Sequence, residues 1–236
     1  MEVIMKVLLI ETATQVCSVA LAEGGSIIAR RESDEPNAHS SHLAVYVDEI
    51  LNECGLKPAD IDAVCVSSGP GSYTGLRIGV SSAKGLCYAL GKPLIAVPTL
   101  ESMAALYYRQ HSDYQGMVCP MIDARRMEVY AAIFDANLNK IEDTAALVIN
   151  ENSFEALRKD HRLWLFGDGA PKLSKLFENQ ININIIDGFK PSAAYMRPLA
   201  EKALRERAFV DVAYFEPFYL KDFVAGKPHV KGLVES

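Results

Sequence analysis

The chain has 236 residues, a formal net charge of −6 and a hydrophobic content of 50%. This length accommodates one large domain or two small ones, with a sizeable core in either case. The negative charge argues against a protein that holds nucleic acid unaided, because such binding requires a basic surface, but it does not exclude a subunit of a complex whose other members supply that surface.

Cysteine spacing and the absence of long apolar runs indicate the compartment. The five cysteines have no C-x-x-C spacing, so they predict no zinc site, and four of them lie in apolar runs typical of a core. An odd number without a pairing pattern fits a reducing compartment. The N-terminal run 1–13 is too short and too acidic at its end for a signal peptide, and no stretch approaches a membrane span. We therefore expect a cytoplasmic protein that does not associate with membranes.

The first half of the chain predicts three strands followed by alternating helices and strands. The strands end at Glu11, cover 17–22 and cover 26–32, with a Gly24-Gly25 hairpin turn before the third. The rest of this half reads as a helix over 40–54, a strand over 62–68, a helix over 76–90, a strand over 93–98 and a helix from Thr99.

The second half repeats this order. Residues 117–144 again predict three strands, and the later elements are a helix over 153–159, a strand over 162–167, a helix over 172–178, a strand over 182–186 and a helix over 192–207. Aligning Ile10-Glu11 with Ile122-Asp123 places an acidic residue at the end of each first strand. We therefore predict an α/β protein of two lobes, 1–110 and 111–236, each a mixed sheet with helices.

Duplicated units of this kind resemble the actin-like ATPase and sugar-kinase superfamily. In that architecture the hairpin turns after the first strands, here 11–16 and 123–128, face a nucleotide between the lobes. The resemblance implies a degenerate nucleotide cleft, with ATP or ADP left open as a ligand, formed by Glu11, Thr12, Asp123, Gly167, Asp168 and Gly169.

Glu11 and Asp123 form a pair of candidate carboxylates. In a kinase or ATPase such residues orient Mg²⁺-bound phosphate or a water molecule. In the alternative interpretation, each ends a strand and accepts hydrogen bonds in its own turn, and Arg125 and Arg126 neutralise Asp123.

The most specific string in the chain is "GPGSYTGLRIG", residues 69–79. It is neither a Walker A loop nor a G-x-G-x-x-G motif, although its N–H groups could face an anion. We favour a tight strand-to-helix connection, because no general base, nucleophile or metal ligand accompanies it. The signature residues are Gly69, Pro70, Gly71, Ser72, Thr74, Gly75 and Arg77.

This string and three others carry a family resemblance. Together with "LLIETATQVCSVAL", "NAHSSHLAVYVDEIL" and "PMIDARRMEVYAAIF", it resembles the TsaB family over 1–135, with "GDG" and "EPFYLKDF" as looser matches later. The resemblance implies a non-catalytic partner of TsaD, the transferase that adds a threonylcarbamoyl group to adenosine in tRNAs reading ANN codons. It further implies recruitment of the ATPase TsaE, tRNA binding only through the complex, and a homodimer when TsaD is absent.

Two histidines are the candidate metal ligands. His39 and His42 lie three residues apart at the start of a helix, which permits a shared metal. The only third ligand on offer is Asp222, and the surrounding motif of the metal-binding relative is absent. We therefore predict no metal site and no cofactor.

The two predicted helices differ in their outward sides. A core stripe comprises Leu43, Val47, Ile50, Leu51 and Cys54 in the first helix and Leu76, Val80, Ala83, Cys87 and Leu90 in the second. The far side of the second helix lacks charge, which favours close approach of another helix. The predicted partner interface consists of Val45, Tyr46, Glu49, Ile78, Ser82, Gly85 and Ala89. The alternative is that both sides of this helix are buried inside one chain.

These observations predict a scaffold and activator subunit that is not an enzyme by itself. The alternatives are a stand-alone phosphotransferase or glycoprotease-like enzyme, and a structural homodimer that binds no small molecule. The protease alternative has little support, because no Ser-His-Asp set can be placed and H-E-x-x-H is absent.

Overall fold

The core of the first lobe is a sheet whose central strand is apolar on both sides. A computed structural model of the chain describes residues 5–221. In β1 (Lys6–Glu11), Leu8 and Ile10 point to one core and Val7 and Leu9 to another. A strand with helices on both faces of its sheet has such a continuous apolar run, since both rows of side chains are buried.

The elements of the first half follow the predicted order. They are β1 (Lys6–Glu11), β2 (Cys17–Glu23), β3 (Ser26–Ser33), α1 (Ala38–Glu53), η1 (Pro58–Asp60), β4 (Ala63–Ser67), α2 (Tyr73–Leu90), β5 (Leu94–Val97) and α3 (Thr99–Gln110).

The second half repeats these elements with shorter helices. They are β6 (Met117–Asp123), β7 (Glu128–Phe134), β8 (Lys140–Val148), α4 (Glu155–Asp160), β9 (Leu163–Phe166), η2 (Pro171–Leu173), α5 (Ser174–Phe177), β10 (Ile183–Ile186), η3 (Ala193–Met196) and α6 (Arg197–Glu206).

The two sheets have the same topology. Their strand orders are β3-β2-β1-β4-β5 and β8-β7-β6-β9-β10, and in each the first three strands are antiparallel while the last two run parallel to the first. Glu11 ends β1 and Asp123 ends β6, as the alignment of the halves predicts. The predicted fold class, duplicated actin-like lobes with mixed sheets, is therefore confirmed.

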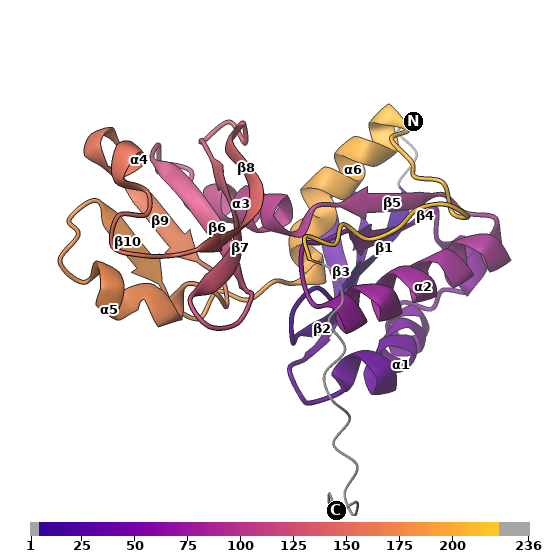
Figure 1. Cartoon of the computed structure of the whole chain (residues 1–236). Coiled ribbons are helices and arrows are strands. Elements are labelled where there is room, and N and C mark those ends of the chain that lie inside the picture. The colour runs from indigo at the N-terminus through magenta and orange to yellow at the C-terminus, as the bar shows by residue number, and fades with distance from the viewer. Residues whose placement is uncertain (1–4, 222–236) are drawn as a thin grey trace, which may run out of the picture.

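Each half contributes its last helix to the sheet of the other half. Leu100, Met103 and Tyr107 of α3 pack in the core of the second sheet, whereas Met196 of η3 and Ala200 of α6 pack on the first. Figure 1 shows α6 beside β5 in the first lobe and α3 behind the strands of the second. The exchange joins the two lobes through two helices in addition to the connecting chain.

Helices α1 and α2 cover the other face of the first sheet. They lie next to each other in Figure 1, and both contribute to the core that contains Leu8, Ile10 and Val66. In the second lobe the corresponding positions hold only the short α4 and α5. The long helix pair is therefore a feature of the first lobe alone.

Candidate partner interface

The buried sides of α1 and α2 are the predicted ones. Eight residues of the two predicted stripes are buried, namely Leu43, Val47, Ile50, Leu51, Leu76, Val80, Ala83 and Cys87. Cys54 and Leu90, which complete the predicted stripes, are half-buried at the edge of this core. Each helix consequently turns its opposite side away from the sheet.

The outward side of α2 is neutral and uncovered. Thr74, Ser81, Gly85, Tyr88 and Ala89 are all exposed, and Tyr88 retains 86% of its surface. A Cβ atom on Gly85 would meet nothing within 4 Å in the described chain. Residues 5–221 therefore do not bury this side of α2, contrary to the alternative that both sides are buried inside one chain.

The predicted interface residues of α2 do not all face away from the sheet. Gly85 and Ala89 are exposed as expected, but Ile78 and Ser82 are half-buried, and Ile78 packs against the core that α1 and α2 share. The helical wheel identified the core stripe but not the half-buried flank that contains Ile78 and Ser82. It also missed Tyr88, whose signal was a large aromatic residue outside the core stripe.

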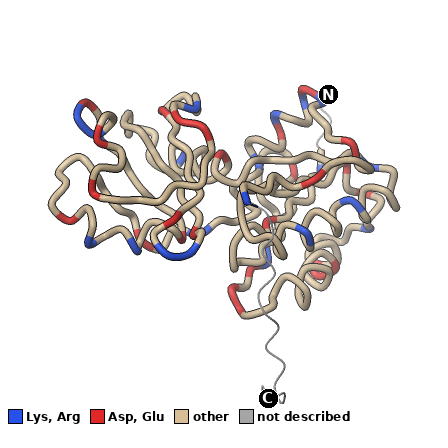
Figure 2. Tube along the Cα trace, viewed as in Figure 1, with Lys and Arg blue, Asp and Glu red and all other residues tan. Residues whose placement is uncertain are grey.

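The two cations of α2 are held on its other flank. The Lys84 ammonium donates to the backbone carbonyls of Ala213 and Phe215, at 3.1 and 3.0 Å. The Arg77 guanidinium lies 5.7 Å from the centre of the Tyr73 ring. Figure 2 shows α2 with blue segments and no red. Charge is therefore absent from the middle of the outward side.

The predicted residues of α1 have mixed environments. Val45 is 48% exposed, whereas Tyr46 is half-buried with its ring 5.3 Å from that of His42. Glu49 is exposed, but its carboxylate pairs with Arg31 of β3 at 3.1 Å. Val45 is thus the predicted α1 residue that offers apolar surface to a partner.

The signature loop is packed tightly against the β1–β2 turn. A Cβ atom on Gly71 would lie 2.3 Å from the Ala13 carbonyl oxygen, and one on Gly75 would lie 2.2 Å from the Thr12 carbonyl oxygen. Gly69 has φ 104° and precedes Pro70 through a cis peptide bond. Glycine is required here because backbone approaches backbone, in agreement with the favoured interpretation of a tight connection.

The N–H groups of this loop bond within the chain. The Ser72 N–H donates to the Ala13 carbonyl at 2.6 Å, and the Gly75 N–H donates to the Ser72 hydroxyl at 3.3 Å. Ser72 is therefore the N-cap of α2, and its side chain starts the helix three residues earlier than predicted. The N–H groups of Ser72 and Gly75 are therefore already hydrogen-bonded within the chain and are not available to an anion.

The C-terminal segment 208–221 closes over this loop. The Phe218 N–H donates to the Ser68 carbonyl at 2.7 Å, and the Tyr219 ring lies 4.7 Å from that of Tyr73. A Cβ atom on Gly69 would lie 2.7 Å from the Phe218 carbonyl oxygen. Sequence patterns gave no signal for this contact, because the segment lacks regular periodicity.

In the first lobe, the candidate cleft residues Glu11 and Thr12 are fully buried. One carboxylate oxygen of Glu11 accepts the Ala13 N–H at 2.6 Å, while Glu11 Oε2 and Thr12 Oγ1 have no partner in the described chain. Burial raises the pKa of Glu11 to about 7.

In the second lobe the candidate residues gather around the end of β6. Asp168 accepts the Asp123 N–H at 3.0 Å, and a Cβ atom on Gly167 would lie 2.2 Å from the Met121 carbonyl oxygen. A Cβ atom on Gly169 would lie 2.9 Å from the Ile122 carbonyl carbon. The loop 167–169 thereby fixes the position of Asp123.

One expectation about Asp123 is wrong. Its carboxylate pairs with the Lys172 ammonium, whereas Arg125 contributes only its backbone N–H, at 3.0 Å, and the Arg126 side chain does not contact it. Within residues 5–221, no hydrogen bond or ion pair joins Asp123 or the loop 167–169 to Glu11 or Thr12.

The histidine pair and the cysteines have separate environments. His39 is half-buried, and burial lowers its pKa, while His42 Nδ1 lies 2.7 Å from the Ser41 hydroxyl. In the part of the chain that the structure describes, no three His, Cys, Asp or Glu side chains gather as metal ligands, and Asp222 lies outside that part. All five cysteines are free, and four are buried as predicted.

No helix among residues 5–221 is both long enough and apolar enough to cross a membrane.

Comparisons with known proteins agree with this architecture. The family model of TsaD, tRNA N6-adenosine threonylcarbamoyltransferase, matches residues 33–228. The tRNA threonylcarbamoyladenosine biosynthesis protein TsaB of Escherichia coli is 35% identical, with 94% of this chain and 97% of the relative covered. The TsaB protein of Bacillus subtilis is 30% identical, covering 92% and 94%.

Two solved structures from Pseudomonas aeruginosa are similar over most of the chain. A protein described as similar to the peptidase YeaZ has a TM-score of 0.80, at 26% identity over 92% of this chain and 100% of that one. A structure described as YeaZ has a TM-score of 0.76 at the same identity and coverage.

Proposed function

Because the chain belongs to the TsaB family of tRNA threonylcarbamoyladenosine biosynthesis proteins, we propose that it is a non-catalytic subunit that activates TsaD by pairing with it through α1 and α2. In this proposal the pair recruits the ATPase TsaE, and tRNA binds through the complex. The chain needs no cofactor of its own.

The observation that carries the proposal is the neutral outward side of α2. Thr74, Ser81, Gly85 and Ala89 are small, so another helix can approach closely, and Tyr88 supplies the kind of exposed aromatic side chain that dominates binding energy in many interfaces. Val45 extends this apolar surface onto α1.

The match to the transferase family supports TsaD as the occupant. The model that matches residues 33–228 describes the transferase, so the two chains share a fold that includes α1 and α2. A partner of the same fold presents an equivalent helix pair, and two such pairs can pack about a pseudo-twofold axis. The same geometry accounts for a homodimer when the transferase is absent.

The state of the candidate cleft supports a scaffold over a phosphotransferase. Glu11 is sealed from solvent, and the N–H groups of Ser72 and Gly75 donate inside the chain. Asp123 is paired with Lys172. These groups form contacts within the chain, so few polar groups of the candidate cleft remain to bind a nucleotide.

Co-elution of the chain with TsaD tests the proposal. Ala89→Glu and Ser81→Glu place a carboxylate on exposed positions of α2, so the fold tolerates them, while docking would bury the charge at a cost of about 3 kcal/mol or more. We expect loss of co-elution for both variants. Ile78→Glu is a poor choice, because Ile78 is half-buried within its own chain.

Ile181→Glu is the matched control, because Ile181 is 94% exposed on the other lobe. It should co-elute as the wild type does. Retention of TsaD by Ala89→Glu and Ser81→Glu would contradict the proposed surface. Absence of any wild-type complex, with a stable homodimer, would favour the structural homodimer.

Calorimetry with ATP and Mg²⁺ distinguishes the proposed non-catalytic subunit from a stand-alone phosphotransferase. We expect no binding by the isolated chain. Micromolar affinity that Glu11→Ala abolishes would favour the nucleotide-dependent enzyme instead.

A further inference from the structure

The turn between β6 and β7 holds two arginines in an unfavourable backbone conformation. Arg125 has φ 71° and Arg126 has φ 53°, both in the left-handed region that favours glycine. The turn is closed by the Ala124 N–H donating to the Glu128 carbonyl and the Glu128 N–H donating to the Arg125 carbonyl. Such strain often accompanies a functional role for the side chains.

Both guanidinium groups are exposed and unengaged. Neither forms a hydrogen bond or an ion pair with any residue from 5 to 221. The two nearest acids in the sequence are already neutralised, since Asp123 pairs with Lys172 and Glu128 pairs with Lys221. Figure 2 shows the turn as a continuous blue stretch at the edge of the second lobe. The turn therefore presents net positive charge on a chain whose overall charge is −6.

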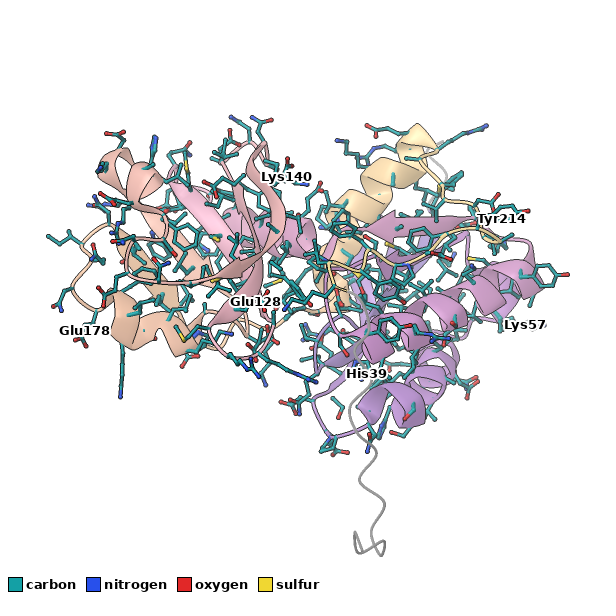
Figure 3. The ribbon with its side chains drawn as sticks, in the orientation of Figure 1. His39, Lys57, Glu128, Lys140, Glu178 and Tyr214 are labelled. Carbon is teal, nitrogen blue, oxygen red and sulfur yellow. The ribbon has the colours of Figure 1, made fainter. Side chains whose placement is uncertain are left out.

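A chain of contacts connects this turn to the start of α2. Lys221 pairs with Glu128, the residue that ends the turn and is labelled in Figure 3. Two residues before Lys221, the Tyr219 ring lies against the ring of Tyr73, the first residue of α2. The Arg77 guanidinium lies over the same Tyr73 ring. Residues 219–221 thus bridge this turn and the amino end of α2, the helix proposed to bind TsaD.

From this arrangement we infer that Arg125 and Arg126 bind the phosphate backbone of the tRNA held by the complex. A guanidinium matches the oxygens of a phosphate through paired N–H donors, which a lysine ammonium cannot reproduce. The inference rests on the proposed function for the identity of the RNA. A backbone contact of this kind adds affinity without reading sequence, which suits a subunit that assists a separate catalytic chain.

Filter binding of an in vitro transcribed ANN-reading tRNA to the chain–TsaD complex tests the inference. The double variant Arg125→Ala/Arg126→Ala should raise Kd by about tenfold or more at about 100 mM NaCl. Between about 50 and about 200 mM NaCl, the slope of log K against log salt should become shallower by about 1 per arginine. The double lysine variant should keep most of the slope.

Two glycine variants separate charge from backbone strain. Arg126→Gly should raise Tm because it relieves the left-handed conformation, and it should weaken tRNA binding. Arg207→Gly is the matched control, because Arg207 is also exposed, with φ 54°, at the end of α6. It should raise Tm in the same way and leave the tRNA Kd unchanged.

Co-elution with TsaD is recorded for every variant, so failure of the proposed function is visible separately. The isolated chain is also titrated with the tRNA at about 50 mM NaCl, where weak phosphate contacts are strongest. An unchanged Kd and salt slope for the double alanine variant would overturn the inference. Loss of ATP binding by the complex with intact tRNA binding would also overturn it and assign the arginines to a nucleotide.

Discussion

A Cβ atom on Gly79 would lie 2.1 Å from the hydroxyl oxygen of Thr12, because α2 crosses the β1–β2 turn with no space for a side chain between them. With Gly71 and Gly75, this contact fixes the amino end of α2 on the first sheet. The orientation of the outward side of α2 is set by this packing.

Gly79→Ala should therefore destabilise the fold. We expect the free energy of unfolding to fall by about 2 kcal/mol, as the added methyl group overpacks the turn. Urea unfolding measures this change. Gly85→Ala in the same helix is the matched control, since its Cβ meets nothing within 4 Å, and it should stabilise by about 0.5 to 1 kcal/mol. Equal effects at the two positions would contradict the packing described for Thr12.

Glu11 should make stability depend on pH. Burial raises its pKa from 4.5 to about 7, so the folded state holds the proton more tightly than the unfolded chain does. The stability that this proton contributes is complete below about pH 4.5 and is lost as pH rises to about 7, by about 3 kcal/mol in total.

Unfolding of wild type and Glu11→Gln across this pH range measures the effect. The amide keeps the oxygen that accepts the Ala13 N–H and has no charge to desolvate. We expect the variant to match the wild type at low pH and to exceed its stability at pH above 7. Parallel pH curves for the two proteins would show that Glu11 does not titrate in this way.

Lys84→Met should loosen the segment 208–221. Its ammonium joins α2 to the carbonyls of Ala213 and Phe215, and loss of both bonds should cost about 1 to 2 kcal/mol. Hydrogen exchange across 208–221 should increase while exchange in β1 stays slow. Lys202→Met, at an exposed position on α6, is the control and should leave exchange in the segment unchanged.

Tyr88→Ala should weaken the pairing with TsaD. A central aromatic residue of an interface commonly contributes about 2 kcal/mol on truncation, which corresponds to about thirtyfold in Kd. Calorimetry of the two purified subunits gives this value. Ile181→Ala removes an equally exposed apolar side chain from the second lobe and should have no effect. Equal Kd values for wild type and Tyr88→Ala would place the contact surface elsewhere.

The duplicated order of elements was accessible from the sequence, because strand alternation, glycine turns and helix stripes are local signals. Helix ends were less accurate. The sequence predicts that α2 begins at residue 76, whereas the Ser72 cap allows the helix to begin at Tyr73. The predicted helix over 192–207 begins as the 3₁₀ turn η3 before α6 starts at Arg197.

Contacts between distant segments could not be predicted. A helical wheel shows which side of α2 is apolar, but it does not say that Ile78 packs against the core below α1 and α2 or that Lys84 reaches Ala213. Likewise, the alternative interpretation of the sequence had Arg125 and Arg126 neutralise Asp123, whereas Lys172, 49 residues away in the chain, takes that place. Such pairings depend on the meeting of elements that have no shared local pattern.

The exchange of α3 and α6 gives the chain an interlocked construction. Cutting the chain between residues 110 and 111 would leave each fragment with a helix that packs on the other sheet and with one face of its own sheet uncovered. Neither repeat should therefore fold by itself, although each has its complete set of strands. Co-expressed fragments should instead recombine, and the intact protein should unfold in one cooperative step.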